Sequence, residues 1–329
     1  MLDHGMRRRA TASAAAAALC AGFLLAACSS ATSTSTPSSE AIATTNPAPE
    51  TTGAAAGSLP PTVSGGSAAP ASSTPPTVGA NADPKNFDPA AFGPDLVDIN
   101  PWFPLTPGYQ SVREGGVNKG SRRLPHRRVY TVTDVTKEIN GVKTVLVLDQ
   151  DFDGGELAEQ ALDYLAEDNQ GNVWYLGSYT EAYEGGQFVN ANDAWLDGVN
   201  GGKAGVLMMA NPQTDTPTYA QASVPGEGTA KAKVVKTGEK VCVPFNCYEG
   251  VLVIQEGKSE DTYFAAGVGG IKLQPKSGDP QETEEMINLT QLSAQGLAEL
   301  SAEALKLDQN ARKEASDVFG SSAPAERAR

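Results

Sequence analysis

Three aspartates at alternate positions come closest to a metal-binding motif in this sequence. Asp149, Asp151 and Asp153, followed by Gly154, match the first half of a calcium loop of the Asp-x-Asp-x-Asp-Gly type. Alternate carboxylates can converge on a hard cation while the glycine permits a sharp turn. The twelfth position is Gln160 rather than the bidentate glutamate, so the second half of the motif fails. We expect an acidic hairpin turn and no resident cofactor, with calcium at the three aspartates as the alternative.

Histidine chemistry depends on one residue, because His126 is the only histidine after His4. It lies within the basic run Arg122–Arg128. One histidine cannot build a multi-histidine zinc site. A Ser-His-Asp arrangement would call for a nucleophile elbow, which the sequence lacks, and the four neighbouring arginines should disfavour a protonated imidazolium. We therefore expect a solvated basic loop here, with a patch for an acidic partner or a cell-wall polymer as the alternative.

Other catalytic signatures are missing from the sequence, which has no Walker loop, dinucleotide fingerprint or metalloprotease motif. Glu181 and Glu184 lie near aromatic residues and could imitate the paired carboxylates of a glycosidase, but such pairs are common in an acidic chain. We assign no catalytic residue. The sequence favours a protein that is not an enzyme, with a secreted hydrolase using acidic residues as the alternative.

The aromatic residues offer a surface for ligand contact or for core packing. The stretch Asn100–Gly108 holds two aromatic residues among three prolines, so it should be stiff, extended and easily packed against a core. Packing is the favoured role. The candidate ligand-contacting residues are Trp102, Trp174, Tyr175 and Trp195.

Two cysteines, Cys242 and Cys247, flank a four-residue loop between two strand-like runs. In an oxidising compartment such a pair should form a disulfide across a hairpin. A redox-active pair is disfavoured because the spacing is not Cys-x-x-Cys.

The N-terminal residues read as an export signal. Basic Arg7–Arg9 precedes an apolar run from Ala14 to Ala27, which is shorter than the roughly 20 residues of a membrane-spanning helix. Leu25-Ala26-Ala27-Cys28 resembles the bacterial lipobox, in which small residues precede a cysteine that is lipidated. We expect cleavage before Cys28, with diacylglycerol on its thiol, palmitate as a modification, and an extracytoplasmic protein anchored to the cell membrane. An ordinary secretory signal with a chance cysteine is the alternative.

The segment after Cys28 is rich in Ser, Thr, Ala and Pro and cannot bury enough apolar surface to fold. The remainder is more regular in its patterning. We expect a signal peptide over residues 1–27 and a disordered tether over 28–83. An antiparallel β-domain over 84–292, a C-terminal helix over 293–317 and a disordered tail over 318–329 should follow.

The charge balance excludes one class of partner. The chain has 25 Lys and Arg against 39 Asp and Glu, and cleavage after residue 27 would leave 22 against 38, a net charge of −16. Such a surface repels phosphate backbones, so we expect no nucleic-acid partner.

Alternation and turn signals predict strands throughout the folded region. Residues 128–134 alternate, residues 142–148 form a Val/Leu run, and Asn140-Gly141 between them is a hairpin signal. Residues 157–167 contain helix-favouring Glu, Leu and Ala, but we assign them to a strand facing 142–148. The pattern indicates a mainly β fold, an antiparallel open sheet or half-barrel.

The spacing of apolar residues changes from strand-like alternation to a helical period at the C-terminal end. After a last strand at 285–292, apolar residues recur at helical spacing over 294–315, with Ser293 as the N-cap. We expect one long helix that covers a face or edge of the sheet.

Four stretches together resemble a family of uncharacterised secreted proteins and lipoproteins of high-GC, actinobacteria-like bacteria. They are Asn100–Gly108, Asp168–Gly177, Ala194–Val199 and Ala304–Asp308. The resemblance spans roughly 95–323 and implies a β-rich domain with a C-terminal helical tail, but it implies no catalytic residues. We therefore expect a lipid-anchored envelope protein whose β-domain binds a ligand or a partner, with a calcium-stabilised structural protein as a further alternative.

Overall fold

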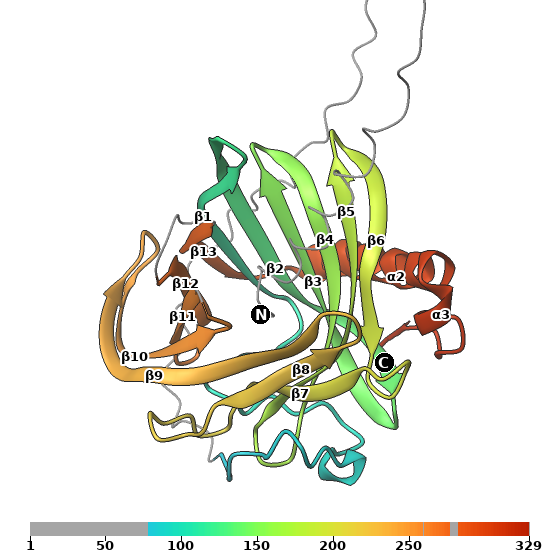
Figure 1. Cartoon of the computed structure of the whole chain (residues 1–329), viewed down its shortest axis with the longest axis horizontal. Coiled ribbons are helices and arrows are strands. Elements are labelled where there is room, and N and C mark those ends of the chain that lie inside the picture. Colours follow the sequence, from blue (N-terminus) through green and yellow to red (C-terminus); the bar gives the residue numbers. More distant parts are fainter. Residues whose placement is uncertain (1–77, 259, 277–281, 329) are drawn as a thin grey trace, which may run out of the picture.

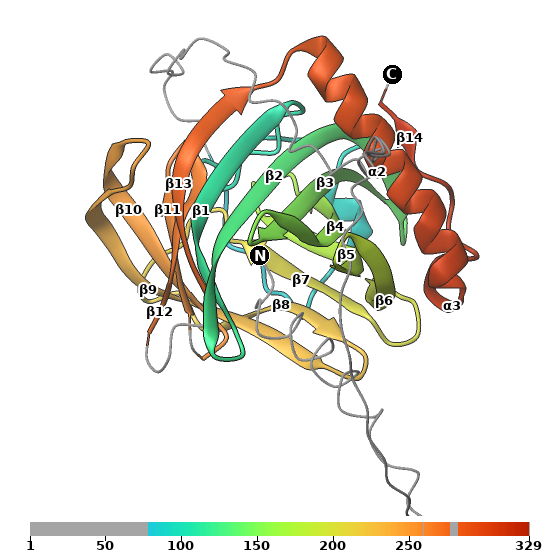
Figure 2. The ribbon, with the colours of Figure 1, turned by 90° about the horizontal axis from the view of Figure 1, so that it is seen from above.

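The computed structural model describes residues 78–258, 260–276 and 282–328. Twelve antiparallel strands form a closed barrel, in which β1 pairs with β2 on one side and with β13 on the other (Figures 1 and 2). The barrel strands are β1 Tyr109–Lys119, β2 Arg122–Ile139, β3 Val142–Asp153, β4 Glu156–Glu167, β5 Val173–Glu184, β7 Lys203–Met208, β8 Tyr219–Val224, β9 Gly228–Cys242, β10 Cys247–Glu256, β11 Glu260–Ala265, β12 Gly269–Pro275 and β13 Glu282–Gln291.

Closure of the barrel contradicts the predicted open sheet or half-barrel, although the mainly β class is correct. The contact that closes it joins the first barrel strand to the last. For example, the amide of Gly116 donates to Oγ1 of Thr283, 167 residues away in sequence. Local alternation predicts strands but contains no signal for so distant a pairing.

The segment rich in helix-favouring residues is a strand, as predicted. β4 pairs with β3 along one edge and with β5 along the other. Its residues are mostly buried from both sides. Tertiary pairing and burial outweigh its intrinsic preference for helix.

A helical layer covers the outside of β2 to β5. It comprises α2 Ala294–Glu314 and α3 Ser316–Phe319. Ser293 caps α2 by accepting a hydrogen bond from the amide of Gly296 at 3.2 Å, as predicted. Phe319 packs against Tyr164 and Tyr179. Among the described residues, no helix is both long and apolar enough to span a membrane.

The C-terminal residues differ from the expected disordered tail. β14 Glu326–Arg327 pairs with β2 at Thr136 and Val135. Asp308 of α2 holds this end by accepting from the amide of Ala325 at 2.9 Å. Backbone pairing with a barrel strand gives even this polar segment a defined place. β6 Gln187–Leu196 also lies off the barrel and pairs with β5 alone.

The segment before β1 runs across one end of the barrel, after the short helix η1 Pro89–Ala91 (Figure 1). Asn100 donates from Nδ2 to the carbonyl oxygens of Gly171 and Met209. Phe103 is buried against Tyr130 of β2, edge to face. The stiff stretch predicted to pack against the core therefore does so. The expected signal peptide and most of the expected tether lie outside the described residues.

Candidate ligand site inside the barrel

A row of charged side chains lines the inside of the barrel on β2 and β3. Tyr164 of β4 contacts Asp308 of the outer helix, so its strand neighbour Asp163 faces inward. Asp163 pairs with Val147, and the alternation along β3 therefore places Asp149, Asp151 and Asp153 inward as well. On β2, His126 and Arg128 pair with two of these aspartates and share their face.

This placement corrects the predicted basic loop and confirms the predicted acidic hairpin turn, because β3 ends at Asp153 and β4 begins at Glu156. Residues 122–128 begin β2 and contain buried His126 and Arg128, so they are not a solvated basic loop. Asp149, Asp151 and Asp153 lie on an extended strand and do not adopt the conformation of a calcium loop. In both cases the pairing of β2 with β3 determined the conformation of the segment.

Arg128 is held by the first aspartate of the row. Its Nε lies 2.8 Å from Oδ1 of Asp149, and its Nη2 contacts Oδ2 of the same carboxylate. This fork geometry is the strongest form of arginine–carboxylate contact. Burial disfavours the charge, but Asp149, Glu284 and Asp151 outweigh it and raise the pKa of Arg128 well above its usual value.

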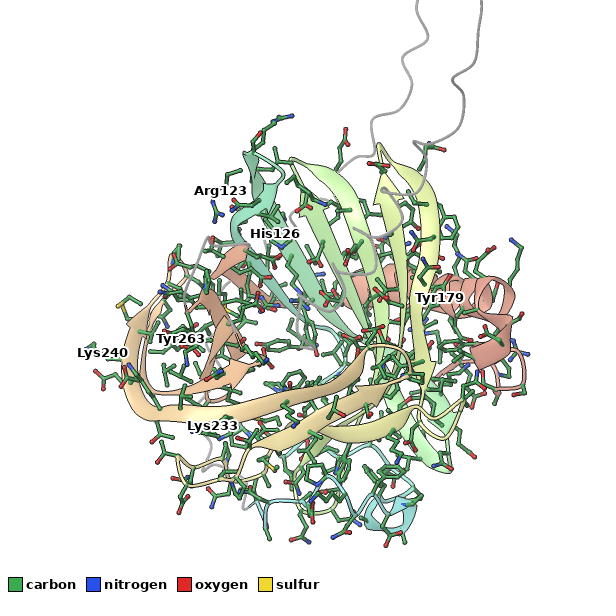
Figure 3. All side chains as sticks on the ribbon, viewed as in Figure 1. Arg123, His126, Tyr179, Lys233, Lys240 and Tyr263 are labelled. Carbon is green, nitrogen blue, oxygen red and sulfur yellow. A yellow bond between two sulfur atoms is a disulfide. The ribbon has the colours of Figure 1, made fainter. Side chains whose placement is uncertain are left out.

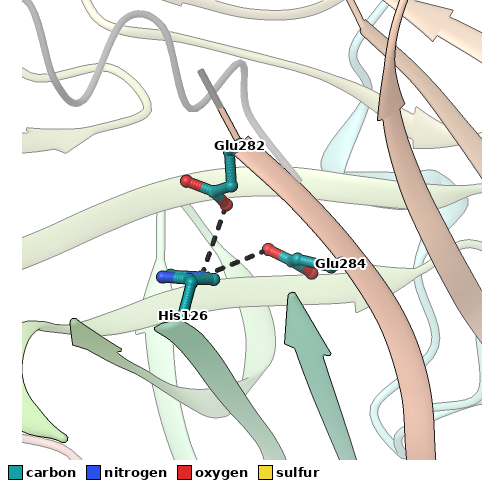
Figure 4. Close-up of side chains that lie close together, drawn as sticks. All are labelled: His126, Glu282 and Glu284. Atoms are coloured by element: carbon teal, nitrogen blue, oxygen red, sulfur yellow. Dashed lines mark ion pairs between the residues drawn. The ribbon is translucent and has the colours of Figure 1, made fainter. Parts of the chain in front are cut away.

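His126 lies at the centre of the cluster, surrounded by carboxylates (Figure 4). Its Nδ1 lies 2.7 Å from Oδ1 of Asp153. Its Nε2 faces Oε1 of Glu282 at 3.4 Å, Oε1 of Glu284 at 3.6 Å and Oδ1 of Asp151 at 3.7 Å. In Figure 3, His126 lies near β1, whereas Tyr179 lies beside α2.

The carboxylates around His126 reverse the expected effect on its protonation. Burial lowers the pKa of the imidazole, but Asp153, Glu284, Glu282 and Asp151 together raise it to about 11. The carboxylates therefore favour the charged form of the ring. The prediction that arginines would disfavour this charge is wrong, because carboxylates from β3 and β13 lie closer to the ring.

Glu284 joins the histidine to two buried arginines. Its Oε2 lies 3.2 Å from Nη1 of Arg113, and its Oε1 lies 3.6 Å from Nη1 of Arg128. Burial raises the pKa of Glu284, but the two guanidinium groups hold it well below its usual range. Glu284 is therefore a carboxylate at any physiological pH.

The cluster can offer ligands to a cation. His126, Glu282 and Glu284 each present a donor atom within 4.8 Å of the other two. All three residues are buried. An open depression of about 550 Å³ between β1, β12 and β13 has Thr283 and Glu284 among its lining residues, while the side chain of Glu284 is fully buried.

Local sequence patterns missed three members of the site, Arg113, Glu282 and Glu284. The only available signal was the alternation of Glu282 and Glu284, which lie ahead of the strand predicted at 285–292 but belong to the observed β13 and share one of its faces. This alternation points to the site only once it is known that β1 alone separates β13 from β2, the strand that carries His126.

The aromatic candidates do not gather around His126. Trp174 and Tyr175 are neighbours on β5 and their polar groups bond separate carboxylates. Trp174 donates from Nε1 to Asp168 at 2.9 Å, and Tyr175 donates to Asp163 at 2.6 Å. Trp195 packs edge to face against Tyr175. Ligand contact remains a prediction for Trp102, Trp174, Tyr175 and Trp195.

The predicted disulfide is confirmed. Cys242 and Cys247 are bonded to each other and are paired across β9 and β10. Cys28 lies outside the described residues, so its lipidation remains a prediction.

The fold and the site define a closed antiparallel barrel with a charged interior. No family model and no curated protein matches the chain, so the resemblance to a family of high-GC bacteria remains a prediction. A solved structure of a protein inferred to be exported, with a YMCC-like fold, from Bacteroides fragilis shares 14% identity with a TM-score of 0.29, covering 57% of this chain and 98% of that one. A protein inferred to be a lipoprotein from Parabacteroides distasonis shares 12% identity with a TM-score of 0.30, covering 59% of this chain and 100% of that one. Scores this low transfer nothing to this chain.

Proposed function

We propose that this protein is a lipid-anchored extracytoplasmic binding protein that takes a cationic ligand into the interior of its barrel. The anchor is supported by the lipobox-like residues that end in Cys28. The observation that carries the binding function is the convergence of buried charged side chains from β1, β2, β3 and β13 around His126.

Stability alone gives little reason to keep such a cluster. Burying charges costs desolvation energy that ion pairing often fails to recover, and apolar side chains of similar size would do as well. On the inward faces of β2, β3 and β4, the positions beyond the cluster include Val132, Val147 and Leu165, all of which are buried. The chain can therefore fill the barrel with apolar residues, and the charged part is best explained by a ligand.

The character of the cluster favours a cation. Its described side chains include five carboxylates, against two guanidinium groups, one imidazole and the half-exposed ammonium of Lys119, which lies 3.1 Å from Oδ2 of Asp153. The buried members are Asp149, Asp151, Asp153, Glu282, Glu284, Arg113, Arg128 and His126. Carboxylate oxygens accept hydrogen bonds and bind cations, whereas an anionic ligand would be repelled.

The same groups are poorly suited to proton transfer. General acid–base catalysis works best with groups whose pKa lies near the working pH. The pKa of His126 is about 11, and the pKa of Glu284 lies far below its usual range. The cluster is thus better suited to holding charge than to exchanging protons.

One observation favours the alternative of a hydrolase. Glu167 is buried at the edge of a separate cavity of about 260 Å³ that Asp98 also lines. Burial raises the pKa of Glu167 to about 7, and Asp98 adds to the rise. A carboxyl with that pKa can act as a general acid. Hydrolytic activity that is abolished in Glu167→Gln would establish this alternative.

The binding function can be tested by thermal denaturation of the intact chain with a panel of ligands. The panel includes putrescine, spermidine, glucosamine and divalent metal chlorides, with neutral sugars and citrate for comparison. A ligand that binds only the folded state raises the melting temperature. We expect at least one cation to do so, and the double variant Glu282→Gln/Glu284→Gln to lose the effect.

A buried carboxylate on β10, three strands from β13, supplies the matched control. Glu256 of β10 accepts hydrogen bonds from Gln221 and Thr262. Glu256→Gln should therefore retain the response to the cation. A melting temperature that no cation changes would contradict the proposed function.

A further inference from the structure

We infer that the barrel interior holds one divalent transition-metal ion, bound by Nε2 of His126 and by one carboxylate oxygen each from Glu282 and Glu284. This inference rests on the proposed function and names the cation. The ligands come from the barrel strands β2 and β13.

The distances from the histidine to the two glutamates are compatible with shared coordination of one metal ion. From Nε2 of His126, the oxygens of Glu282 and Glu284 lie at 3.4 and 3.6 Å. Ligands bound tetrahedrally at about 2.0 to 2.2 Å from one ion are separated by about 3.3 to 3.6 Å.

The partners of the ligands orient them toward a common centre. Asp153 lies 2.7 Å from Nδ1 of His126, so a neutral ring keeps its proton there and directs the Nε2 lone pair toward Glu282 and Glu284. Arg113 engages Oε2 of Glu284, and Oε1 lies 3.6 Å from Nε2 of His126 and 3.6 Å from Nη1 of Arg128. A carboxylate behind the ligating imidazole is the usual support of such a ligand.

A glycine lets the ligands meet across an intervening strand. β1 separates β2 from β13, and its Gly115 pairs with His126 on one side and Glu284 on the other. Because Gly115 has no side chain, nothing from β1 stands between the two. A β-carbon at this position would overlap the carbonyl oxygen of Thr283.

The donor atoms select the class of metal. Imidazole nitrogen suits Zn²⁺, Co²⁺, Ni²⁺ and Fe²⁺, whereas Ca²⁺ and Mg²⁺ prefer oxygen ligands alone.

The test is calorimetric titration of Zn²⁺ into the intact chain after removal of metals with a chelator. We expect one equivalent to bind. Glu282→Gln and Glu284→Gln should each weaken binding at least 100-fold, whereas Glu256→Gln should leave it unchanged. Asp153→Asn should retain the stoichiometry and weaken binding by about 10- to 100-fold, as expected for a residue that orients a ligand. Circular dichroism would confirm that each variant is folded.

A spectroscopic measurement on the wild-type protein tests the metal ligands directly. Co²⁺ bound at this site should give visible absorption bands typical of tetrahedral coordination, and X-ray absorption should show one imidazole nitrogen among oxygen ligands. Three results would each overturn the inference. They are that Zn²⁺ fails to bind, that both glutamine variants leave its binding unchanged, or that Ca²⁺ binds as tightly as Zn²⁺.

If organic cations still raise the melting temperature while Zn²⁺ fails to bind, the proposed function stands and the metal site does not. If no cation acts, both fall.

Discussion

His126 of β2 and Glu284 of β13 face each other across Gly115 of β1, with 3.6 Å between Nε2 and Oε1. The two residues are far apart in sequence and are not on directly paired strands. Their meeting depends on barrel closure and on the missing side chain between them. This relationship is the centre of both the proposed function and the metal site.

Gly115→Ala should disturb this arrangement. The added β-carbon would overlap the backbone of Thr283, so the strands must shift. We expect a loss of about 1 to 3 kcal/mol in the free energy of unfolding, measured by urea denaturation. Gly93→Ala is the control, because its β-carbon would lie no closer than 3.5 Å to a neighbouring atom. Equal stability of the two variants would refute the close packing of β1 against β13.

Glu167 should make stability depend on pH. Its pKa rises from 4.5 to about 7 on folding, chiefly through burial. The neutral form is favoured in the fold, so its contribution is fully present below about pH 4.5 and is lost as the pH rises through about 7. The difference amounts to roughly 3 kcal/mol.

Glu167→Gln should remove this dependence, since glutamine does not titrate. Chemical denaturation of both proteins at pH 4.5, 6 and 8 would measure it. The wild type should lose stability relative to the variant as the pH rises. A constant difference between the two across this range would show that Glu167 titrates normally.

Asp308→Asn should loosen the outer helix. Asp308 of α2 lies 2.8 Å from Nζ of Lys137 on β2, and both side chains are buried. The variant leaves a buried ammonium without its carboxylate, which we expect to cost about 3 kcal/mol. Lys313→Ala removes an exposed ion pair with Glu314 on the same helix and should leave the melting temperature unchanged. Comparable melting temperatures for Asp308→Asn and the wild type would contradict this role.

Cys28→Ala should release the protein from the membrane if the lipobox is used. Fractionation of cells that express each form would show the wild type with the membranes and the variant in the soluble fraction. Cys20→Ala is the matched control, because Leu19 before it is too bulky for the lipobox position. Membrane association that survives loss of Cys28 would exclude this anchor.

The sequence predicted much of the secondary structure because local rules determine it. Alternation and turn signals located β2 and β3, the N-cap Ser293 located the start of α2, and cysteine spacing identified the hairpin disulfide. The same rules misjudged the basic run. Neighbouring residues on a strand point to opposite faces, so Arg127 is directed away from His126.

What the sequence by itself determined is the strand and helix pattern, the disulfide and the acidic balance, since each depends on residues close together in the chain. Only the tertiary structure decided that the sheet closes and that His126 lies among carboxylates. Glu282 and Glu284 reach that histidine through the pairing of the first and last barrel strands. No local pattern encodes that distance, so the electrostatic environment of the site emerged only from the closed fold.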